Sequence, residues 1–272
     1  MLTLTDYFAR IGFEGNVDAS LDTLRALHHC QPRAIAFENL STVLNEPVRI
    51  DIDSVSDKLI TRNRGGYCFE QNALLQAVLT EMGFDVTGLS ARVVWSEANG
   101  HQNPRTHMVL LVVLDGQRWI CDVGFGGATV TSPLKLDTDL PQATSHERVR
   151  LRREGHEYVA EVEWGSDFRS MYRFDLQPQL PIDFEALNHY VATHPRSHFR
   201  TTLFAGRVLE NSRLALLNGT VAELQGGTTV SERQLVDGAA LCLVLAEEFG
   251  IDMSSFRDPE RQLQTFLAAR SD

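Results

Sequence analysis

The spacing of apolar residues divides the chain into a helical part, a strand-rich part and a mixed part. Near the start, Leu21, Leu24 and Leu27 recur every third position behind Ser20, which can cap a helix. Residues 68–82 form a second predicted helix, because their apolar positions recur three and four apart and Gly83 can end it. The first part is therefore expected to be helical.

From Asp85 onward the pattern changes to alternating and β-branched residues, which is typical of strands. Turn signals such as Asp115-Gly116 and Glu154-Gly155 separate the runs. The predicted strands are 92–95, 107–114, 118–123, 148–152, 158–164 and 169–176. We expect a mostly antiparallel sheet or barrel in this middle third.

The last third mixes both patterns. A helix is predicted from Ile182 to just before Pro195, followed by strands 201–209 and 213–217. A turn at Asn218-Gly219 and a return strand come next. Ser231 and Gln234 form a capping box, which predicts a long helix over 232–249. Asp258-Pro259 is expected to start a final short helix. The fold class is α+β.

Composition and charge exclude several classes of protein. The chain has 272 residues and 36 acidic against 25 basic side chains, which argues against a broad nucleic-acid surface. Its longest apolar run, 239–246, is far shorter than the roughly 18 residues that cross a bilayer. No signal peptide and no membrane partner are expected. The four cysteines are widely spaced, which predicts free thiols in a reducing cytoplasm.

The most informative segment is residues 64–72, which read RGGYCFEQN. Two glycines allow a tight turn, and Cys68 then falls in the first turn of a predicted helix. Unpaired N–H groups and the helix dipole stabilise a thiolate at such a position. The alternative is a buried structural cysteine, which is the interpretation favoured for Cys30, Cys121 and Cys242.

A cysteine nucleophile needs a histidine base and a group that orients it. The Asp115-Gly116 turn predicts that Leu114 pairs with Gln117 in a hairpin, and counting outward makes His107 and Asp122 diagonal neighbours on one face. A buried carboxylate also needs a partner. A Cys–His–Asp triad follows; the alternative is a surface histidine and an aspartate that merely ends a strand.

Other candidates are weaker. The glycine-rich turn with Gly124, Gly126 and Gly127 can present N–H groups to an anion such as a pyrophosphate, or can simply be a tight strand exit. Three histidines near Pro195 lack a metal-binding spacing, so no metal site is predicted. The pair His28-His29 is interpreted as charged residues at a helix end and receives no function.

Together these motifs resemble the arylamine N-acetyltransferase family, and the bacterial branch in particular. The resemblance lies in RGGYCFEQN at 64–72, FENL at 37–40, the strand beginning at His107 and DVGFG at 122–126. It implies an N-terminal helical bundle with the cysteine (1–85), a central antiparallel β-barrel with the histidine and aspartate (86–185) and a C-terminal α/β lid (186–272). It also implies a cysteine-protease-like Cys-His-Asp core.

The resemblance further implies ping-pong transfer of acetyl from acetyl-CoA, through a Cys68 thioester, to an arylamine, hydrazine or arylhydroxylamine. His107 would be the base and Asp122 its orienter. The implied supporting positions are an ion pair of Glu38 with Arg64 and an acceptor pocket of Phe37, Phe125 and Phe204. With acetyl-CoA as the donor, the glycine-rich turn offers Gly124, Gly126 and Gly127 as candidate contacts for CoA. No oligomeric state is predicted.

Two other functions remain open from the residues. A Cys–His–Asp triad also suits an amide hydrolase or a transglutaminase-like enzyme, since the same three groups attack amides on related folds. A non-catalytic acyl-CoA-binding module would leave Cys68 unreactive. The fate of the acyl group separates the first from a transferase, and alkylation of Cys68 tests the second.

Overall fold

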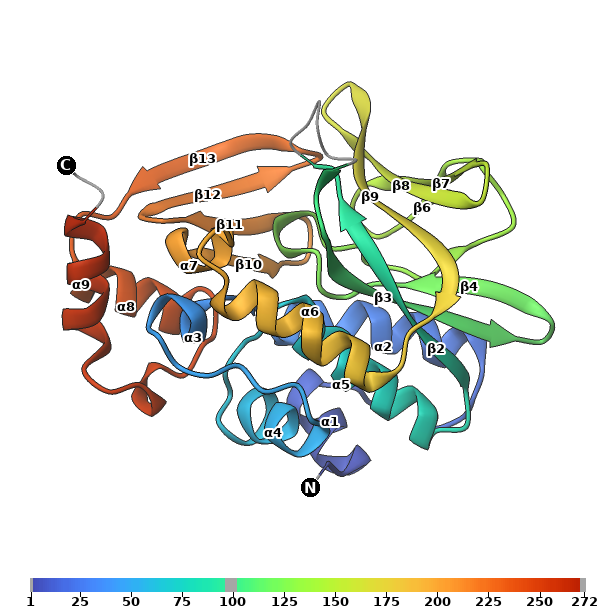
Figure 1. The fold of residues 1–272 in the computed structure, drawn as a ribbon, viewed down its shortest axis with the longest axis horizontal. Coiled ribbons are helices and arrows are strands. Elements are labelled where there is room, and N and C mark those ends of the chain that lie inside the picture. Colours follow the sequence, from blue (N-terminus) through green and yellow to red (C-terminus); the bar gives the residue numbers. More distant parts are fainter. Residues whose placement is uncertain (1, 96–101, 270–272) are drawn as a thin grey trace.

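A computed structural model describes residues 2–95 and 102–269 of the chain. The N-terminal part is helical, and α1, α4 and α5 lie in the lower part of Figure 1, beneath the two sheets. Its elements are α1 (Leu4–Ile11), α2 (Leu21–Ala34), α3 (Leu40–Val43), α4 (Ile52–Ser56), a π-helical turn (Asp57–Thr61) and α5 (Cys68–Glu81), with the short strand β1 (Phe37–Glu38) between α2 and α3.

The two predicted helices of this part are confirmed as α2 and α5. The Ser20 hydroxyl accepts the Thr23 N–H at 3.2 Å and caps α2. At the start of α5, the Glu70 carboxylate accepts the Tyr67 N–H at 3.0 Å. Beyond its last turn, Gly83 takes a left-handed conformation with φ of 88°, which suits glycine.

The middle of the chain forms an eight-stranded antiparallel sheet that curls into a nearly closed barrel. Its strands, in spatial order, are β5 (Leu134–Lys135), β4 (Gln117–Cys121), β3 (Arg105–Leu114), β2 (Asp85–Val93), β9 (Asp167–Pro178), β8 (Glu157–Trp164), β7 (Arg148–Glu154) and β6 (Gln142–Ala143). The predicted strand 92–95 overlaps only the end of β2. The strand begins earlier than predicted, since Asp85 already pairs with Val113 of β3.

The β3–β4 hairpin has the predicted register. Asp115 and Gly116 both have positive φ, and Leu114 pairs with Gln117. The ladder runs back to the pair Leu110 and Cys121, where β4 ends.

The rest of the chain forms a five-stranded antiparallel sheet with flanking helices. The sheet order is β1, β10 (Phe204–Val208), β11 (Arg213–Leu217), β12 (Thr220–Gln225) and β13 (Thr228–Gln234), so a strand of the N-terminal part is its edge. The helices are α6 (Pro181–Thr193), α7 (His198–Thr201), α8 (Gly238–Glu247) and α9 (Pro259–Ala268), and single 3₁₀ turns lie at Gly126–Ala128 and Met253–Ser255.

The predicted helix over 232–249 is wrong in its first part. Residues up to Gln234 belong to strand β13, which pairs with β12 across a turn at Gly226-Gly227. Asp237 then caps α8 by accepting the Ala240 N–H at 2.7 Å. The strand forms because β12 has a free edge, and its backbone hydrogen bonds outweigh a local capping signal. The strand predicted from 201 likewise begins only at Phe204.

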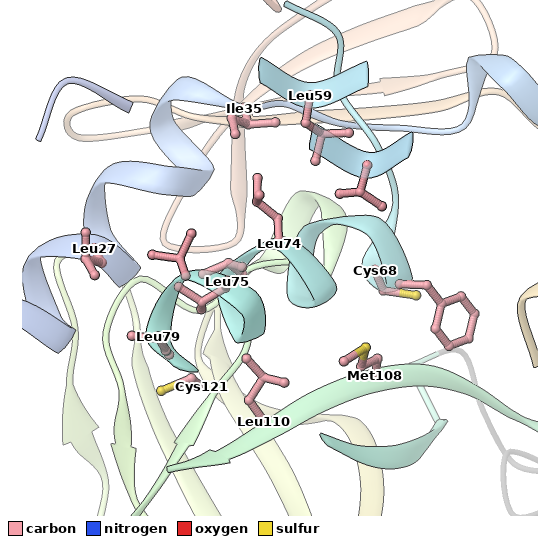
Figure 2. Close-up of a cluster of buried hydrophobic side chains, with 14 of the residues drawn as sticks. Leu27, Ile35, Leu59, Cys68, Leu74, Leu75, Leu79, Met108, Leu110 and Cys121 are labelled. Carbon is pink, nitrogen blue, oxygen red and sulfur yellow. The ribbon is translucent and has the colours of Figure 1, made fainter. Parts of the chain in front are cut away.

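The site lies on the largest buried core, which joins α1, α2 and α5 to strands β3 and β4. Figure 2 shows Cys68 at one end of this cluster, close to Met108 of β3, with Leu75 and Leu110 further along it. A second core fills the barrel, and a third lies between β10–β12 and helices α8 and α9. The core therefore fixes α5 against β3 through apolar contacts.

The division into three domains at residues 85 and 185 stays a prediction. Within residues 2–95 and 102–269, no helix is long and apolar enough to cross a membrane.

Candidate active site

Cys68 is the first residue of α5 and is 3 % exposed. At positions 65 and 66 before it only glycine fits, because a side chain would clash with neighbouring atoms. A Cβ on Gly65 would lie 2.3 Å from the Ala36 carbonyl oxygen, and one on Gly66 would lie 2.8 Å from Glu70 Oε2. This close packing places the thiol next to β3, where Sγ lies 3.5 Å from the Thr106 carbonyl oxygen.

His107 and Asp122 meet as the hairpin count predicts. His107 Nε2 lies 2.8 Å from Asp122 Oδ2, and the two residues are 2 % and 1 % exposed. Burial lowers the pKa of His107, but the Asp122 carboxylate outweighs it, and Cys68 acts in the same direction; the result is a pKa of about 10. The ring is therefore an imidazolium at neutral pH, between the carboxylate and the thiol.

Asp122 stays ionised despite its burial. Burial raises the pKa of its carboxyl group, but His107, Asn72 and the Gly124 N–H favour the charged form, and the net pKa is lowered. Oδ1 accepts the Gly124 N–H at 2.9 Å, while Oδ2 faces His107. Each oxygen of this buried carboxylate has a partner, as a buried charge requires.

The three predicted acceptor-pocket phenylalanines lie around this centre, and each is partly exposed. The Phe125 ring meets His107 edge-on with centroids 5.2 Å apart. Phe37 and Phe204 do not touch each other in a ring contact but are joined by Phe199, at 6.2 and 5.6 Å. Phe199 also contacts Tyr67, the residue before Cys68. It was not predicted as a site residue, because no motif surrounds it in the sequence.

The glycine-rich turn after Asp122 packs closely against the site. A Cβ on Gly124 would lie 2.8 Å from Cys68 Cα. Because the Gly124 N–H donates to Asp122, it is not free for a phosphate. Gly126 and Gly127 are partly exposed, and a contact of these two with CoA stays a prediction.

The predicted supporting pair is part of a larger buried charge network. Arg64 Nη2 lies 3.6 Å from Glu38 Oε1, and Arg64 also contacts Glu46 at 3.1 Å. Lys58 joins Glu38, at 3.8 Å, to Glu70 of α5, at 2.7 Å. Glu38 and Glu70 of this network pack against Gly65 and Gly66, in the turn before Cys68. In the described ranges, no group of three or more histidine, cysteine or acidic side chains is placed to hold a metal ion.

The chain is similar to known proteins along nearly its whole length. The N-acetyltransferase family model matches residues 20–257. The chain is 43 % identical over 249 residues to the arylamine N-acetyltransferase of Escherichia coli, covering 91 % of this chain and 88 % of that protein. With the Mycolicibacterium smegmatis enzyme it is 40 % identical over 273 residues, covering 98 % of both. The chain belongs to the arylamine N-acetyltransferase family.

The solved structures agree with this. The structure of the Mycobacterium marinum arylamine N-acetyltransferase in complex with CoA superimposes with a TM-score of 0.93 at 36 % identity, covering 97 % of this chain and 98 % of that one. The M. tuberculosis enzyme gives 0.93 at 37 %, with 98 % and 100 % covered. The expected α+β fold is confirmed, and membership of an acyltransferase family favours acyl transfer over amide hydrolysis or a non-catalytic module.

Asn72 is a further residue of the site, and it was not among the residues predicted for this family member from the sequence. Its side-chain amide donates to Asp122 Oδ1 at 3.0 Å and to the Met108 carbonyl at 2.8 Å, and its oxygen accepts the Val123 N–H at 3.1 Å. The available signal was spacing, because Asn72 follows Cys68 by four residues and so lies on the same face of the helix.

His28 was interpreted wrongly. It lies inside α2 rather than at its end, and it is fully buried. Burial lowers its pKa to about 4, so it is neutral rather than an imidazolium at neutral pH. The missed signal is that His28 shares the buried stripe of Leu24, Leu27 and Gln31, three and four positions apart.

Proposed function

We propose that this chain transfers acetyl from acetyl-CoA to an arylamine, hydrazine or arylhydroxylamine, and that Cys68 carries the acetyl group between the two substrates. The observation that carries the proposal is the 2.8 Å contact of His107 with Asp122 beside the thiol of Cys68. CoA in the related M. marinum structure supports acetyl-CoA as the donor, and the names of the relatives support an aromatic amine as the acceptor.

In the first half-reaction the Cys68 thiolate attacks the acetyl carbonyl carbon. The bond from that carbon to the CoA sulfur breaks, and the departing sulfur takes a proton from the His107 imidazolium. In the second half-reaction the amine nitrogen attacks the Cys68 thioester. His107 accepts the amine proton, the bond from the acetyl carbon to Sγ breaks, and the thiolate–imidazolium pair is restored.

Asp122 orients the imidazole throughout. Its carboxylate accepts from Nε2, so the other ring nitrogen is left to exchange protons with Cys68 and the substrates. Its lowered pKa supports this role, because an ionised carboxylate favours the imidazolium that each half-reaction needs.

Both substrates are expected to reach the thiol past the aromatic side chains. The partly exposed rings of Phe37, Phe125 and Phe204 suit a planar aromatic acceptor. A glycine-rich turn can present N–H groups to the pyrophosphate of CoA, and we assign this contact to the partly exposed Gly126 and Gly127. A cytoplasmic location is supported by the four cysteines, all of which are unpaired.

Mass spectrometry of the intact protein tests the proposal. Brief exposure to acetyl-CoA is expected to add one acetyl group to the wild type, at Cys68 by peptide mapping, and none to Cys68→Ala. A later addition of an arylamine should remove it faster than water does. Initial rates should give parallel double-reciprocal plots, as ping-pong chemistry requires. Intersecting lines, or an acetyl group found on another cysteine, would contradict the thioester at Cys68.

A further inference from the structure

One fully buried histidine lies behind the site and takes no part in the proposed reaction. His28 projects from the buried face of α2, and its Nε2 accepts the backbone N–H of Asp122 at 3.0 Å. The contact joins residues 94 positions apart in the sequence. It is a bond from a side chain of the helical part to the main chain of the residue that binds His107.

The Asp122 N–H needs such an acceptor because strand pairing has ended there. The β3–β4 ladder stops at Cys121, and Asp122 is 1 % exposed. The next two N–H groups also have acceptors outside the ladder: Val123 donates to Asn72, and Gly124 donates to the Asp122 carboxylate. His28 therefore completes a set of three bonds that shape the chain where it leaves β4.

The bond also defines the state of the ring. A nitrogen that accepts an N–H carries no proton, so the proton of the neutral ring is on Nδ1. Nδ1 has no hydrogen-bond partner in the described part of the chain. Burial is the largest influence on the ring and lowers its pKa to about 4, although the nearby Asp122 carboxylate acts in the opposite direction. The neighbouring titratable side chain on α2, His29, lowers the pKa further. His28 thus stays an acceptor under ordinary conditions.

We propose that His28 is a positioning residue for the triad: by accepting the Asp122 N–H it holds the main chain where the Asp122 carboxylate meets His107. It acts through Asp122 and touches no reacting atom. The inference rests on the proposed function of Cys68, His107 and Asp122. A displacement of about 1 Å at such a site can cost about 10²-fold in rate, so a single backbone bond has a measurable effect.

Two amide variants show whether the site needs a hydrogen-bond acceptor at the position of Nε2 or only a polar side chain. In His28→Gln the amide oxygen can reach the position of Nε2, whereas in His28→Asn it is one bond too short. His28→Leu removes polarity while filling the space. His29→Asn is the matched control, because His29 is the neighbouring residue on α2 and is partly exposed, with Ser145 as its partner.

The readout is the rate of Cys68 alkylation by iodoacetamide against pH, on samples whose folding is checked by circular dichroism and thermal melting. This measurement reports the thiolate–imidazolium pair and needs no acetyl donor. If the proposed acetyl transfer is wrong, acetyl-CoA will not acetylate the wild type. The alkylation rates of the variants can still be compared with that of the wild type, so the role of His28 is tested separately.

We expect His28→Gln and His29→Asn to follow the wild-type profile. His28→Asn and His28→Leu should react about 10-fold more slowly at slightly acid pH. Folded His28→Asn that reacts like the wild type would overturn the proposal, and so would His28→Gln that is as slow as His28→Asn. If neither Asn nor Leu allows folding while Gln does, His28 serves folding alone, and the proposal is likewise overturned.

Discussion

The side chain of Asn72 donates to Asp122 Oδ1 at 3.0 Å and so ties the helix that begins at Cys68 to the carboxylate that binds His107. The same amide group reaches the Met108 carbonyl, one residue beyond His107. One side chain therefore fixes the relative positions of the three segments that form the site.

Replacing Asn72 by alanine should impair both activity and stability. The change leaves the buried Val123 N–H without its acceptor, which costs about 1–3 kcal/mol, and loosens Asp122, for which we expect a loss of about 10²-fold in kcat/KM. Thermal melting and steady-state rates are the measurements. Thr80→Ala, at an exposed position of the same helix, is the control. An active Asn72→Ala enzyme would show that packing alone holds the triad.

Asp122→Asn should give a folded protein with very slow thioester formation. The amide that replaces Oδ2 would donate to His107 Nε2 and force the ring into the wrong tautomer, a change that costs roughly 10⁴-fold in a serine protease triad. Stopped-flow release of CoA measures the step. Asp137→Asn, which removes an exposed carboxylate paired with Arg118, is the control. Near-normal acetylation would remove Asp122 from the mechanism.

Iodoacetamide should label Cys68 at lower pH than the other three cysteines. Burial raises the pKa of Cys30, raises that of Cys242 to about 11, and raises that of Cys121 still further. Of the four cysteines, Cys68 alone lies at a helix N-terminus and beside the His107 imidazolium. Peptide mapping after labelling at a series of pH values shows the order in which the four cysteines react as the pH rises. Earlier labelling of Cys30, which is less buried than Cys68, would show that exposure alone controls reactivity.

In the glycine-rich turn, replacement by alanine should lower the activity at Gly124 but not at Gly127. The Cβ of Gly124→Ala would lie 2.8 Å from Cys68 Cα and 3.0 Å from Asn72 Nδ2, so α5 and the end of β4 must separate and activity should fall by about 10²-fold. Gly127→Ala meets only the Ala215 Cβ, at 3.7 Å, and keeps its N–H. Gly127→Ala should therefore keep the activity and the melting temperature of the wild type, and both quantities are measured for the two variants side by side. Equal tolerance of both changes would contradict the close packing.

Stability should rise with pH between about 4 and 6.5 partly because of His28. Its pKa is lowered from 6.5 to about 4 in the folded chain, so in this range the unfolded state binds more protons and is favoured as the pH falls. The contribution is of the order of 3 kcal/mol for a shift of that size. Urea unfolding of the wild type and His28→Gln across this range measures it. If the free energy of unfolding rises with pH at the same slope in both proteins, the contribution of His28 is refuted.

The hairpin and the helix of the site could be predicted because their signals are local. A two-residue Asp115-Gly116 turn allows one register, and that register alone brings His107 and Asp122 to one face. Likewise, two glycines and the apolar spacing after Cys68 define where α5 begins. In both cases the residues that decide the geometry lie within a few positions of the residues they place.

The errors arose where a distant partner decided the outcome. Residues 231–234 carry a valid capping box, but the open edge of β12 recruits them into β13, and no local pattern shows that edge. His28 likewise carries no motif, and its interpretation as a charged helix end failed because its partner lies beyond the end of β4.

The sequence by itself determined which residues could carry the chemistry, the start of the helix at Cys68 and the hairpin that pairs His107 with Asp122, because short-range backbone geometry specifies each of them. Only the tertiary structure decided how Cys68 comes to lie beside that pair, and that His28 and Asn72 hold Asp122 in place. Those contacts depend on packing α2 and α5 against β3 and β4. Burial is a property of the whole fold, so the pKa values and hydrogen bonds that it creates cannot be assigned from neighbours in the sequence.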